Sequence, residues 1–155
     1  MEINVRLARL SDLPDIIALL ADDDLGRLRE RVGRDVDRAY IEAFLEMRAS
    51  KSNLQLVAED DEGVVGCLQL TFIRGLSRQG ALRAQIEGVR VASRARGRGI
   101  GHRLVRAAID RAREAGCKLV QLTSDKSRTS AHAFYTKLGF VATHEGMKLE
   151  LSNER

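Results

Sequence analysis

A glycine- and arginine-rich stretch, residues 96–101, has the sequence Arg-Gly-Arg-Gly-Ile-Gly and separates two segments of different periodicity. The apolar run 86–91 before it predicts a strand. The segment after it predicts a helix, because apolar residues return at helical spacing at Ile100, Leu104, Val105, Ala108, Ile109 and Ala112. A strand, a glycine turn and a helix in succession place free backbone N–H groups at the positive end of a helix dipole, and glycines let an anion approach them closely. The stretch therefore predicts a pyrophosphate site, surrounded by the charges of Arg94, Arg96, Arg98 and Arg103.

Known phosphate-binding motifs can be compared with this stretch. The dinucleotide fingerprint G-x-G-x-x-G would need glycine at position 102, where the chain has His102, and the P-loop pattern does not occur. The pattern (Q/R)-x-x-G-x-(G/A) does fit, with Arg96, Gly99 and Gly101. Residues 96–101 thus resemble the coenzyme A pyrophosphate motif of the GNAT N-acetyltransferases. Glycine–arginine runs also occur in disordered and nucleic-acid-binding segments, so the position between a strand and a helix supports this interpretation.

A second resemblance lies nearer the C-terminus. Residues 131–140, Ala-His-Ala-Phe-Tyr-Thr-Lys-Leu-Gly-Phe, resemble the GNAT segment A-x-x-F-Y-x-x-L-G-F. Two motifs in this order make the chain similar to the GNAT (GCN5-related) N-acetyltransferase superfamily, of the single-domain, small-molecule type. One departure is Arg128, because the family often has asparagine seven residues before the tyrosine, where it helps to hold the pantetheine arm. Asp125, Lys126 or Ser127 are candidates to replace that contact.

Composition places the chain among soluble globular proteins. It has 155 residues, of which 44% are hydrophobic and 31% charged. No apolar run approaches the roughly 18–20 residues that span a bilayer, and residues 1–6 do not resemble a secretory signal. We therefore expect a cytoplasmic protein without a membrane partner. Two cysteines, Cys67 and Cys117, and three scattered histidines have no metal-ligand spacing, so we expect no metal.

The positive charge of the chain leaves nucleic acid open as a partner. The formal net charge is +4 at pH 7 and the pI is about 9.4. The arginines, however, are spread along the chain, and aromatic residues make up 4% of it with no tryptophan, too few for a platform that stacks single strands. A loop that holds the phosphates of coenzyme A accounts for the local arginine cluster. We therefore expect no nucleic-acid partner.

The pattern of elements predicts a single domain, residues 1–155, of the α/β (layered α+β) class with a mixed, mostly antiparallel central sheet flanked by helices. The order, β-α-α-β-β-β-α-β-α-β-β, coincides with that of the GNAT fold. Strands are expected at 3–7, 54–58, 64–73, 81–91 and 119–122, and in a closing hairpin at 140–143 and 147–151. Helices are expected after a cap at Ser11 or Asp12, at 36–49, from the glycine loop to Gly116, and at 130–138. Residues 22–37 predict a loop or a short helix, and residues 74–80 a loop.

The resemblance implies acetyl-CoA as cosubstrate, bound between two splayed parallel strands, here 87–91 and 119–123. The backbone of Val89 and Val91 would pair with pantetheine like an added strand. His102 is either a phosphate contact or a solvated helix position. The implied coenzyme-binding residues are Val89, Arg90, Val91, Arg96, Gly97, Arg98, Gly99, Ile100, Gly101, His102, Arg128, Ala131, Phe134 and Tyr135.

The resemblance also implies direct attack of a neutral amine on the acetyl carbon, without an acyl-enzyme. An alkylammonium must first lose a proton, and Glu87 is the candidate base or ammonium ligand, with a structural ion pair as the alternative. Residues 86–89 resemble the Ile-Glu-Asp-Val stretch of glucosamine-phosphate acetyltransferases, although Gly88 replaces the second acid. Tyr135 is the candidate proton donor to the CoA thiolate, because a phenol with an ordinary pKa of about 10 is protonated at neutral pH. Its alternative role is packing against the coenzyme. A backbone N–H near Val89 would stabilise the oxyanion.

The acceptor pocket is expected to involve residues 22–31, Tyr40, Gln69, Thr71, Phe72 and Arg83, by analogy with the family. Asp22, Asp23 and Asp24 either recognise a cationic amine or form a solvated loop. A small-molecule primary amine is preferred over a protein N-terminus or lysine. Two alternatives remain: a non-catalytic acyl-CoA sensor or regulatory module of the same fold, and a basic nucleic-acid-binding protein. The family often forms dimers, so a homodimer is possible.

Overall fold

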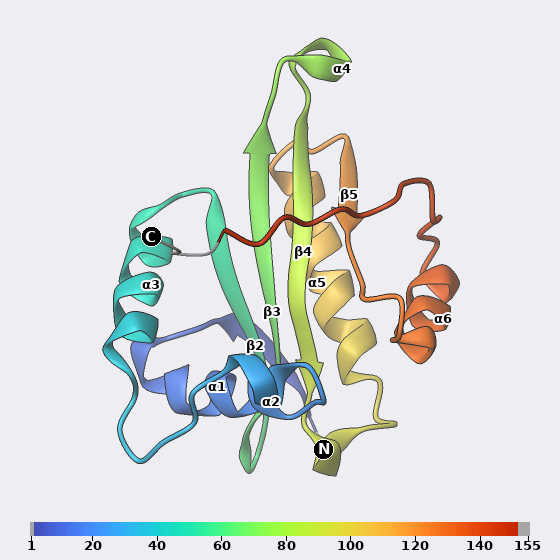
Figure 1. The fold of residues 1–155 in the computed structure, drawn as a ribbon. Coiled ribbons are helices and arrows are strands. Elements are labelled where there is room, and N and C mark those ends of the chain that lie inside the picture. Colours follow the sequence, from blue (N-terminus) through green and yellow to red (C-terminus); the bar gives the residue numbers. More distant parts are fainter. Residues whose placement is uncertain (1, 152–155) are drawn as a thin grey trace. The chain divides into compact units, whose positions relative to one another are not determined.

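The structure is a computed structural model that describes residues 2–151. The chain divides into two compact units, Met1–Leu122 and Thr123–Arg155. The first contains the sheet with its flanking helices, and the second contains one helix and the residues that follow it (Figure 1). Each unit is described by itself. The α/β class predicted from the sequence is confirmed, whereas a single domain over residues 1–155 stays a prediction.

The strands described in the first unit form one five-stranded sheet in the order β1-β2-β3-β4-β5. Neighbours from β1 to β4 are antiparallel, and β4 and β5 are parallel. Sequence order therefore equals spatial order, and only the last pair needs a crossover helix. The bounds are β1 Asn4–Leu7, β2 Asn53–Asp60, β3 Gly63–Arg74, β4 Leu82–Val91 and β5 Leu119–Leu122.

One face of the sheet is covered by α5 (Ile100–Glu114), the crossover helix between β4 and β5. Its buried side chains are Ile100, Leu104, Val105, Ala108 and Ala112, which the helical periodicity predicted, whereas Ile109 of the same predicted face is only half-buried. Gly66 of β3 permits close packing, because a Cβ there would lie 2.9 Å from Leu104 Cδ1 and 3.1 Å from Ile100 Cγ2. The helix ends as expected, since Gly116 has a left-handed φ of +84°.

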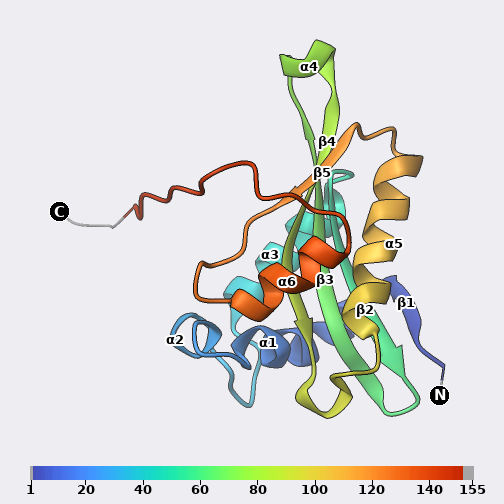
Figure 2. The ribbon, with the colours of Figure 1, turned by 90° about the vertical axis from the view of Figure 1, so that its right-hand side faces the viewer.

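The opposite face is covered in part by α1 (Leu13–Ala21) and α3 (Arg38–Ala49), as Figure 2 shows. Ile16 and Leu19 of α1 pack against Val57 and Cys67 of the sheet. Other α1 residues, Leu13 and Ile17, pack against Phe44 of α3. The short helix α2 (Gly26–Arg29) lies in the segment where the sequence allowed a loop or a short helix.

The start of α1 differs from the expected side-chain cap. Asp12 makes no capping bond to the helix and instead accepts hydrogen bonds from both terminal nitrogens of Arg6, at 2.7 and 3.0 Å. Arg6 also binds Glu59 at 2.9 Å. These bonds from Arg6 lower the pKa of the Asp12 carboxyl. The predicted cap is therefore an ion pair that ties α1 to β1 and β2.

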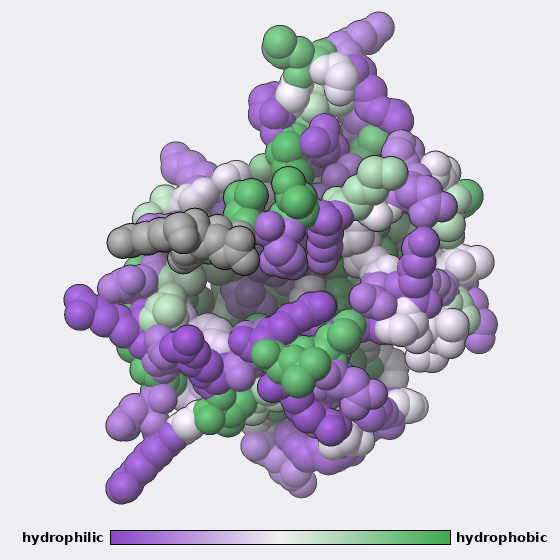
Figure 3. Space-filling view, in the orientation of Figure 1, coloured by the Kyte–Doolittle hydropathy of each residue, from purple (hydrophilic) through white to green (hydrophobic). Residues whose placement is uncertain are grey.

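The β3–β4 hairpin extends beyond the rest of the sheet and is tipped by the turn α4 (Ser77–Gly80) (Figures 1 and 3). The sequence predicted only a loop here. Arg78 and Gln79 have left-handed backbones, with φ of 55° and 62°. Hydrophilic side chains dominate the tip in Figure 3, although Leu76 is 95% exposed.

The second unit contains α6 (Thr129–Lys137), one residue displaced from the predicted helix. The ring of Tyr135 contacts those of Phe134 and Phe140 edge-on, with centroids 5.1 and 5.7 Å apart. The predicted closing hairpin at 140–143 and 147–151 is wrong, because residues 138–151 form no strand. The apolar residues of this segment are exposed: Val141, Met147, Leu149 and Leu151. Alternation of apolar and polar residues therefore does not by itself make a strand, which also needs a neighbouring strand to pair with and a face to bury.

Candidate functional site

The two parallel strands β4 and β5 share only a short ladder. Residues Arg83 to Ile86 of β4 pair with Leu119 to Leu122, where β5 ends. β4 continues through Glu87 to Val91, so the edge that faces β5 extends beyond its partner. Val89, Arg90 and Val91, three of the predicted coenzyme-binding residues, lie on this extension. An exposed strand edge of this kind can accept an extended ligand through backbone hydrogen bonds.

A β-bulge changes the direction of β4 at the beginning of that extension. Gln69 of β3 pairs with Glu87, but Cys67 pairs with Arg90, so two residues of β4 lie opposite Leu68. Gly88 in the bulge has a φ of +60°, a conformation that favours glycine. The Cys67 thiol donates to the Gly88 carbonyl at 3.6 Å, and burial raises its pKa to about 12, so it is no nucleophile.

The predicted strand, glycine loop and helix are present. After the 3₁₀ turn Ser93–Ala95, Gly97 and Gly99 adopt left-handed φ values of 80° and 74°, and Gly99 is the N-cap of α5. The first backbone bond of the helix joins Arg103 N to Gly99 O at 3.1 Å. The N–H groups of residues 100–102 therefore precede the helical bonding pattern and lie at the positive end of the dipole. This arrangement suits a phosphate.

The four arginines that were expected to surround the loop with charge have different surroundings. Arg94 binds Asp60 with both terminal nitrogens, at 3.1 and 3.3 Å, and Arg98 Nη1 lies 3.1 Å from the same carboxylate. Arg103 donates to the carbonyl of Ile3 at 2.8 Å. Arg96 is exposed in the loop. Several of these charges therefore connect the loop to the rest of the first unit.

Asp60 is the residue of this site that sequence reasoning missed. The acidic run 60–62 predicted only a tight turn, but the Asp60 side chain is 0% exposed and also accepts the backbone N–H of Glu62 at 2.9 Å. The hydrogen bond from Arg94 lowers its pKa most, against burial, which raises it. No signal in the sequence distinguishes it from its exposed neighbours Asp61 and Glu62, since their burial is a property of the tertiary structure.

Glu87 belongs to a set of polar side chains on one face of the sheet. This is the face on which Cys67 packs against α1. The register places Glu87 opposite Gln69, and Gln85 opposite both Thr71 and Gln121. Gln85 Nε2 donates to Glu87 Oε1 at 2.5 Å, and Gln121 Nε2 donates to Gln85 Oε1 at 2.9 Å. Within residues 2–151 no ion pair includes Glu87, so the alternative of a structural ion pair is not supported.

Other residues expected at the acceptor pocket are separated by the strand alternation. Gln69 and Thr71 share the polar face with Glu87, whereas Phe72 lies on the α5 face with Gly66 and Leu68. The Tyr40 hydroxyl donates to Glu30 at 2.8 Å and accepts the N–H of Arg31 at 2.9 Å, which fixes the loop before α3. Arg90, a predicted coenzyme ligand, directs its side chain to Asp23 at 3.4 Å.

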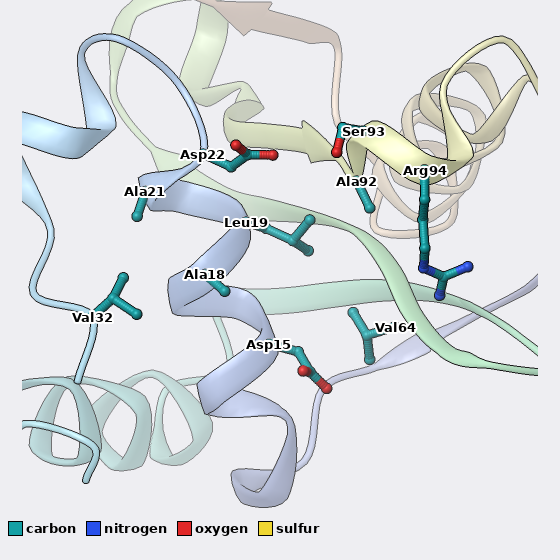
Figure 4. A pocket seen from close by; sticks show the side chains of 10 residues that line it. All are labelled: Asp15, Ala18, Leu19, Ala21, Asp22, Val32, Val64, Ala92, Ser93 and Arg94. Atoms are coloured by element: carbon teal, nitrogen blue, oxygen red, sulfur yellow. The ribbon is translucent and has the colours of Figure 1, made fainter. Parts of the chain in front are cut away.

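A shallow cavity of about 510 Å³ lies where β4 ends and the glycine loop begins (Figure 4). Figure 4 shows Asp22 near Ser93, and Asp15 beside Val64 on the other side, with Leu19 between the two pairs. Arg94, which binds Asp60, forms part of its wall. The lining residues are Asp15, Ala18, Leu19, Ala21, Asp22, Val32, Val64, Ala92, Ser93 and Arg94.

The remaining predicted site residues lie in the second unit. Arg128 precedes α6, and its N–H donates to the Asp125 carbonyl at 3.0 Å. Ala131, Phe134 and Tyr135 are partly buried residues of α6. Their roles toward the coenzyme stay predictions.

Within residues 2–151, no group of three His, Cys, Asp or Glu side chains is arranged to hold a metal ion. In the same part of the chain, no helix has the length and apolar character to cross a bilayer.

Comparison with known proteins gives the family to which this fold belongs. Residues 17–140 match the model of the acetyltransferase (GNAT) family, so the chain belongs to that family. Two rice (Oryza sativa subsp. japonica) proteins are similar. One, a probable glucosamine 6-phosphate N-acetyltransferase 2, is 39% identical over 94 residues, which cover 56% of this chain and about half, 52%, of the relative. Glucosamine 6-phosphate N-acetyltransferase 1 is 36% identical over 121 residues, 73% of this chain and 68% of the relative.

Two solved structures are similar over almost the whole chain. The crystal structure of a transcriptional regulator from Bacillus halodurans C-125 is 49% identical, with a TM-score of 0.94, and the match covers 97% of this chain and 100% of that one. A putative acetyltransferase from Agrobacterium tumefaciens str. C58 is 28% identical, with a TM-score of 0.84 and 96% and 99% coverage. The predicted GNAT resemblance and fold are thereby confirmed.

We predict that Asp60 contributes to the acid sensitivity of the fold. Its folded-state pKa lies below the ordinary value of 3.8, so the stabilisation from its ion pairs is complete above 3.8 and is lost as the pH falls through the lower value. Asp60→Asn should lower the urea midpoint at neutral pH, and its difference from the wild type should shrink in acid. Urea titrations between about pH 7 and pH 3 measure this. The exposed Asp61→Asn is the control, and a constant difference at every pH would contradict the assignment.

Proposed function

We propose that the protein transfers the acetyl group of acetyl-CoA to the primary amine of a small-molecule acceptor, in a ternary complex. The observation that carries this proposal is the extension of β4 beyond β5, followed after one 3₁₀ turn by the left-handed glycine loop at the start of α5. An open strand edge for an extended arm, next to a helix N-terminus for a pyrophosphate, corresponds to the two ends of coenzyme A.

Each part of the coenzyme has candidate partners in the chain. The backbone of residues 89–91 would pair with the pantetheine arm. Residues 96–102 would hold the pyrophosphate through the N–H groups of the first helical turn and the guanidinium of Arg96. Arg90 would contribute its backbone, because its side chain binds Asp23. From the second unit, Arg128, Ala131, Phe134 and Tyr135 are proposed to contact the arm and its thioester.

In the proposed reaction, Glu87 accepts a proton from the acceptor ammonium, directly or through a water. The neutral amine then attacks the acetyl carbon, so that a C–N bond forms and the C–S bond breaks. A backbone N–H near Val89 stabilises the oxyanion, and Tyr135 protonates the departing thiolate. The amide of Gln85 orients the Glu87 carboxylate, whose exposure keeps it accessible to the acceptor.

The acceptor class is supported by the sheet face around Glu87. Its side chains are mostly uncharged hydrogen-bonding groups, which suits a hydroxylated amine better than an apolar one. The names of the two rice relatives point the same way, to glucosamine 6-phosphate. Purified protein should be screened with acetyl-CoA and a panel of glucosamine 6-phosphate, other amines and lysine peptides, with thiol release as the measurement. Turnover of peptides alone would favour a protein N-acetyltransferase.

A non-catalytic acyl-CoA sensor is the second candidate function. It is favoured by the 49% identical structure from Bacillus halodurans, which is described as a transcriptional regulator. The sensor function predicts saturable acetyl-CoA binding without turnover of any amine. The exposed carboxylate of Glu87, which Gln85 orients through a hydrogen bond, supports catalysis instead.

Coenzyme binding is tested by Gly101→Glu. A carboxylate at the second position of α5 would repel the pyrophosphate and fill the space next to the N–H groups, so CoA binding should be lost. Calorimetric titration with CoA and with ADP measures this. Ala115→Glu, at the other end of α5, adds the same side chain and should bind normally. Unchanged affinity of Gly101→Glu would refute the phosphate loop.

Base catalysis is tested by Glu87→Gln. The amide cannot accept the ammonium proton, so kcat/KM for the amine should fall on the order of 10²–10⁴-fold while CoA affinity is preserved. Steady-state kinetics with a chromogenic thiol reagent provide the measurement. Glu114→Gln, an exposed residue at the end of α5, serves as the matched control. A variant as fast as the wild type, under conditions where chemistry limits the rate, would exclude the role.

The acid role is tested by Tyr135→Phe. Loss of the phenol should slow transfer, on the order of 10²-fold, without weakening CoA binding. Thr136→Val is the matched control, because it removes an exposed hydroxyl of the same helix, which donates to the His132 carbonyl at 2.9 Å. Single-turnover rates separate chemistry from product release. Equal rates for both variants and the wild type would reduce Tyr135 to packing.

A further inference from the structure

We infer that Asp60 is a positioning residue for coenzyme binding: by holding Arg94 and Arg98 it fixes the glycine loop in the conformation that receives the pyrophosphate. The inference rests on the proposed function, because it assumes that residues 96–102 bind the phosphates of coenzyme A. It assigns Asp60 no contact with the coenzyme itself.

The contacts of Asp60 connect the loop to the body of the sheet. Asp60 is the last residue of β2, which is paired with β1 on one side and β3 on the other. Both its oxygens bind Arg94 in a two-pronged arrangement, at 3.1 and 3.3 Å, and one of them also binds Arg98 at 3.1 Å. Charge-assisted, two-pronged bonds are strong and directional. A rigid strand end therefore holds two points of the loop.

The loop needs such support. Residues 96–99 are exposed, and Gly97 and Gly99 have left-handed backbones that glycine adopts easily and also leaves easily. Gly99 cannot cap the helix with a side chain. Arg94 lies just before the glycines and Arg98 lies between them, so Asp60 restrains the chain on both sides of Gly97. Ordering this stretch in advance reduces the entropy lost on binding.

Electrostatics alone predicts the opposite effect. The Asp60 carboxylate adds a negative charge near a site for an anion and partly neutralises two arginines, whose side chains are 41% and 29% exposed. If only charge mattered, removal of Asp60 would tighten phosphate binding. If Asp60 positions the loop, its removal weakens binding despite the gain in positive charge. The sign of the change therefore distinguishes the two explanations.

The experiment is calorimetric titration with CoA and ADP of the wild type, Asp60→Asn and Asp61→Asn. Asp61 is exposed and one residue away, so its variant removes the same charge without the arginine contacts. We expect the dissociation constants of Asp60→Asn to rise about tenfold and those of Asp61→Asn to stay within about twofold. Affinity that is unchanged or tighter in Asp60→Asn overturns the inference. A wild type that binds neither ligand overturns the proposed function, and the inference with it.

A second variant covers the case in which Asp60→Asn does not fold. Arg94→Lys keeps the positive charge but cannot form the two-pronged bond, and Asp60 retains Arg98 and the N–H of Glu62. We expect a severalfold weaker affinity for CoA, whereas unchanged affinity overturns the inference. In kinetics, a positioning role raises KM for acetyl-CoA with kcat nearly constant. If Asp60 only stabilises the fold, its loss lowers the fraction of protein that is folded and active, which lowers kcat and leaves KM constant. A fall in kcat at constant KM therefore also overturns the inference.

Discussion

The β4 strand is the constraint on which the rest of the site depends. It is paired with β3 along most of its length but with β5 over only four residues, so its last part has a free edge. The bulge at Gly88 redirects that edge, and the chain then passes through the short 3₁₀ turn Ser93–Ala95 into the glycine loop and α5. A strand edge, a bulge and a helix N-terminus thus follow one another in a single run of sequence, and the proposed coenzyme site requires all three.

The two faces of the sheet have different tasks. The α5 face is a dry core, in which Gly66 lets the helix approach β3 so that the start of α5 is held firmly. The other face is apolar under α1 and polar beyond it, where Gln85 and Gln121 bind one another next to Glu87. Polar groups on a sheet face are tolerated when they bond to each other or to solvent. This arrangement leaves an acidic group on a rigid strand, which suits a proton acceptor.

Charges in the loop serve two purposes that the sequence does not distinguish. A run of arginines around glycines predicts phosphate binding, yet Arg94 and Arg98 bind the buried Asp60, and Arg103 binds a backbone carbonyl. The same is true of Arg6 and Asp12, where an expected helix cap is an ion pair between elements. Partners that lie tens of residues apart in sequence decide whether an arginine is available to a ligand.

Elements with local signals were predictable from the sequence: the strand before the glycine loop, α5 with its end at the left-handed Gly116, and β5. Both motifs that identify the family are also visible in the sequence, because each is short and contiguous. Three features follow only from the tertiary structure: β4 extends beyond β5, Gly88 forms a bulge, and Asp60 is buried. Pairing register and burial depend on residues that are distant in sequence. The missing closing hairpin has the same cause: alternation at residues 140–151 marks a possible strand, but only a partner strand makes one.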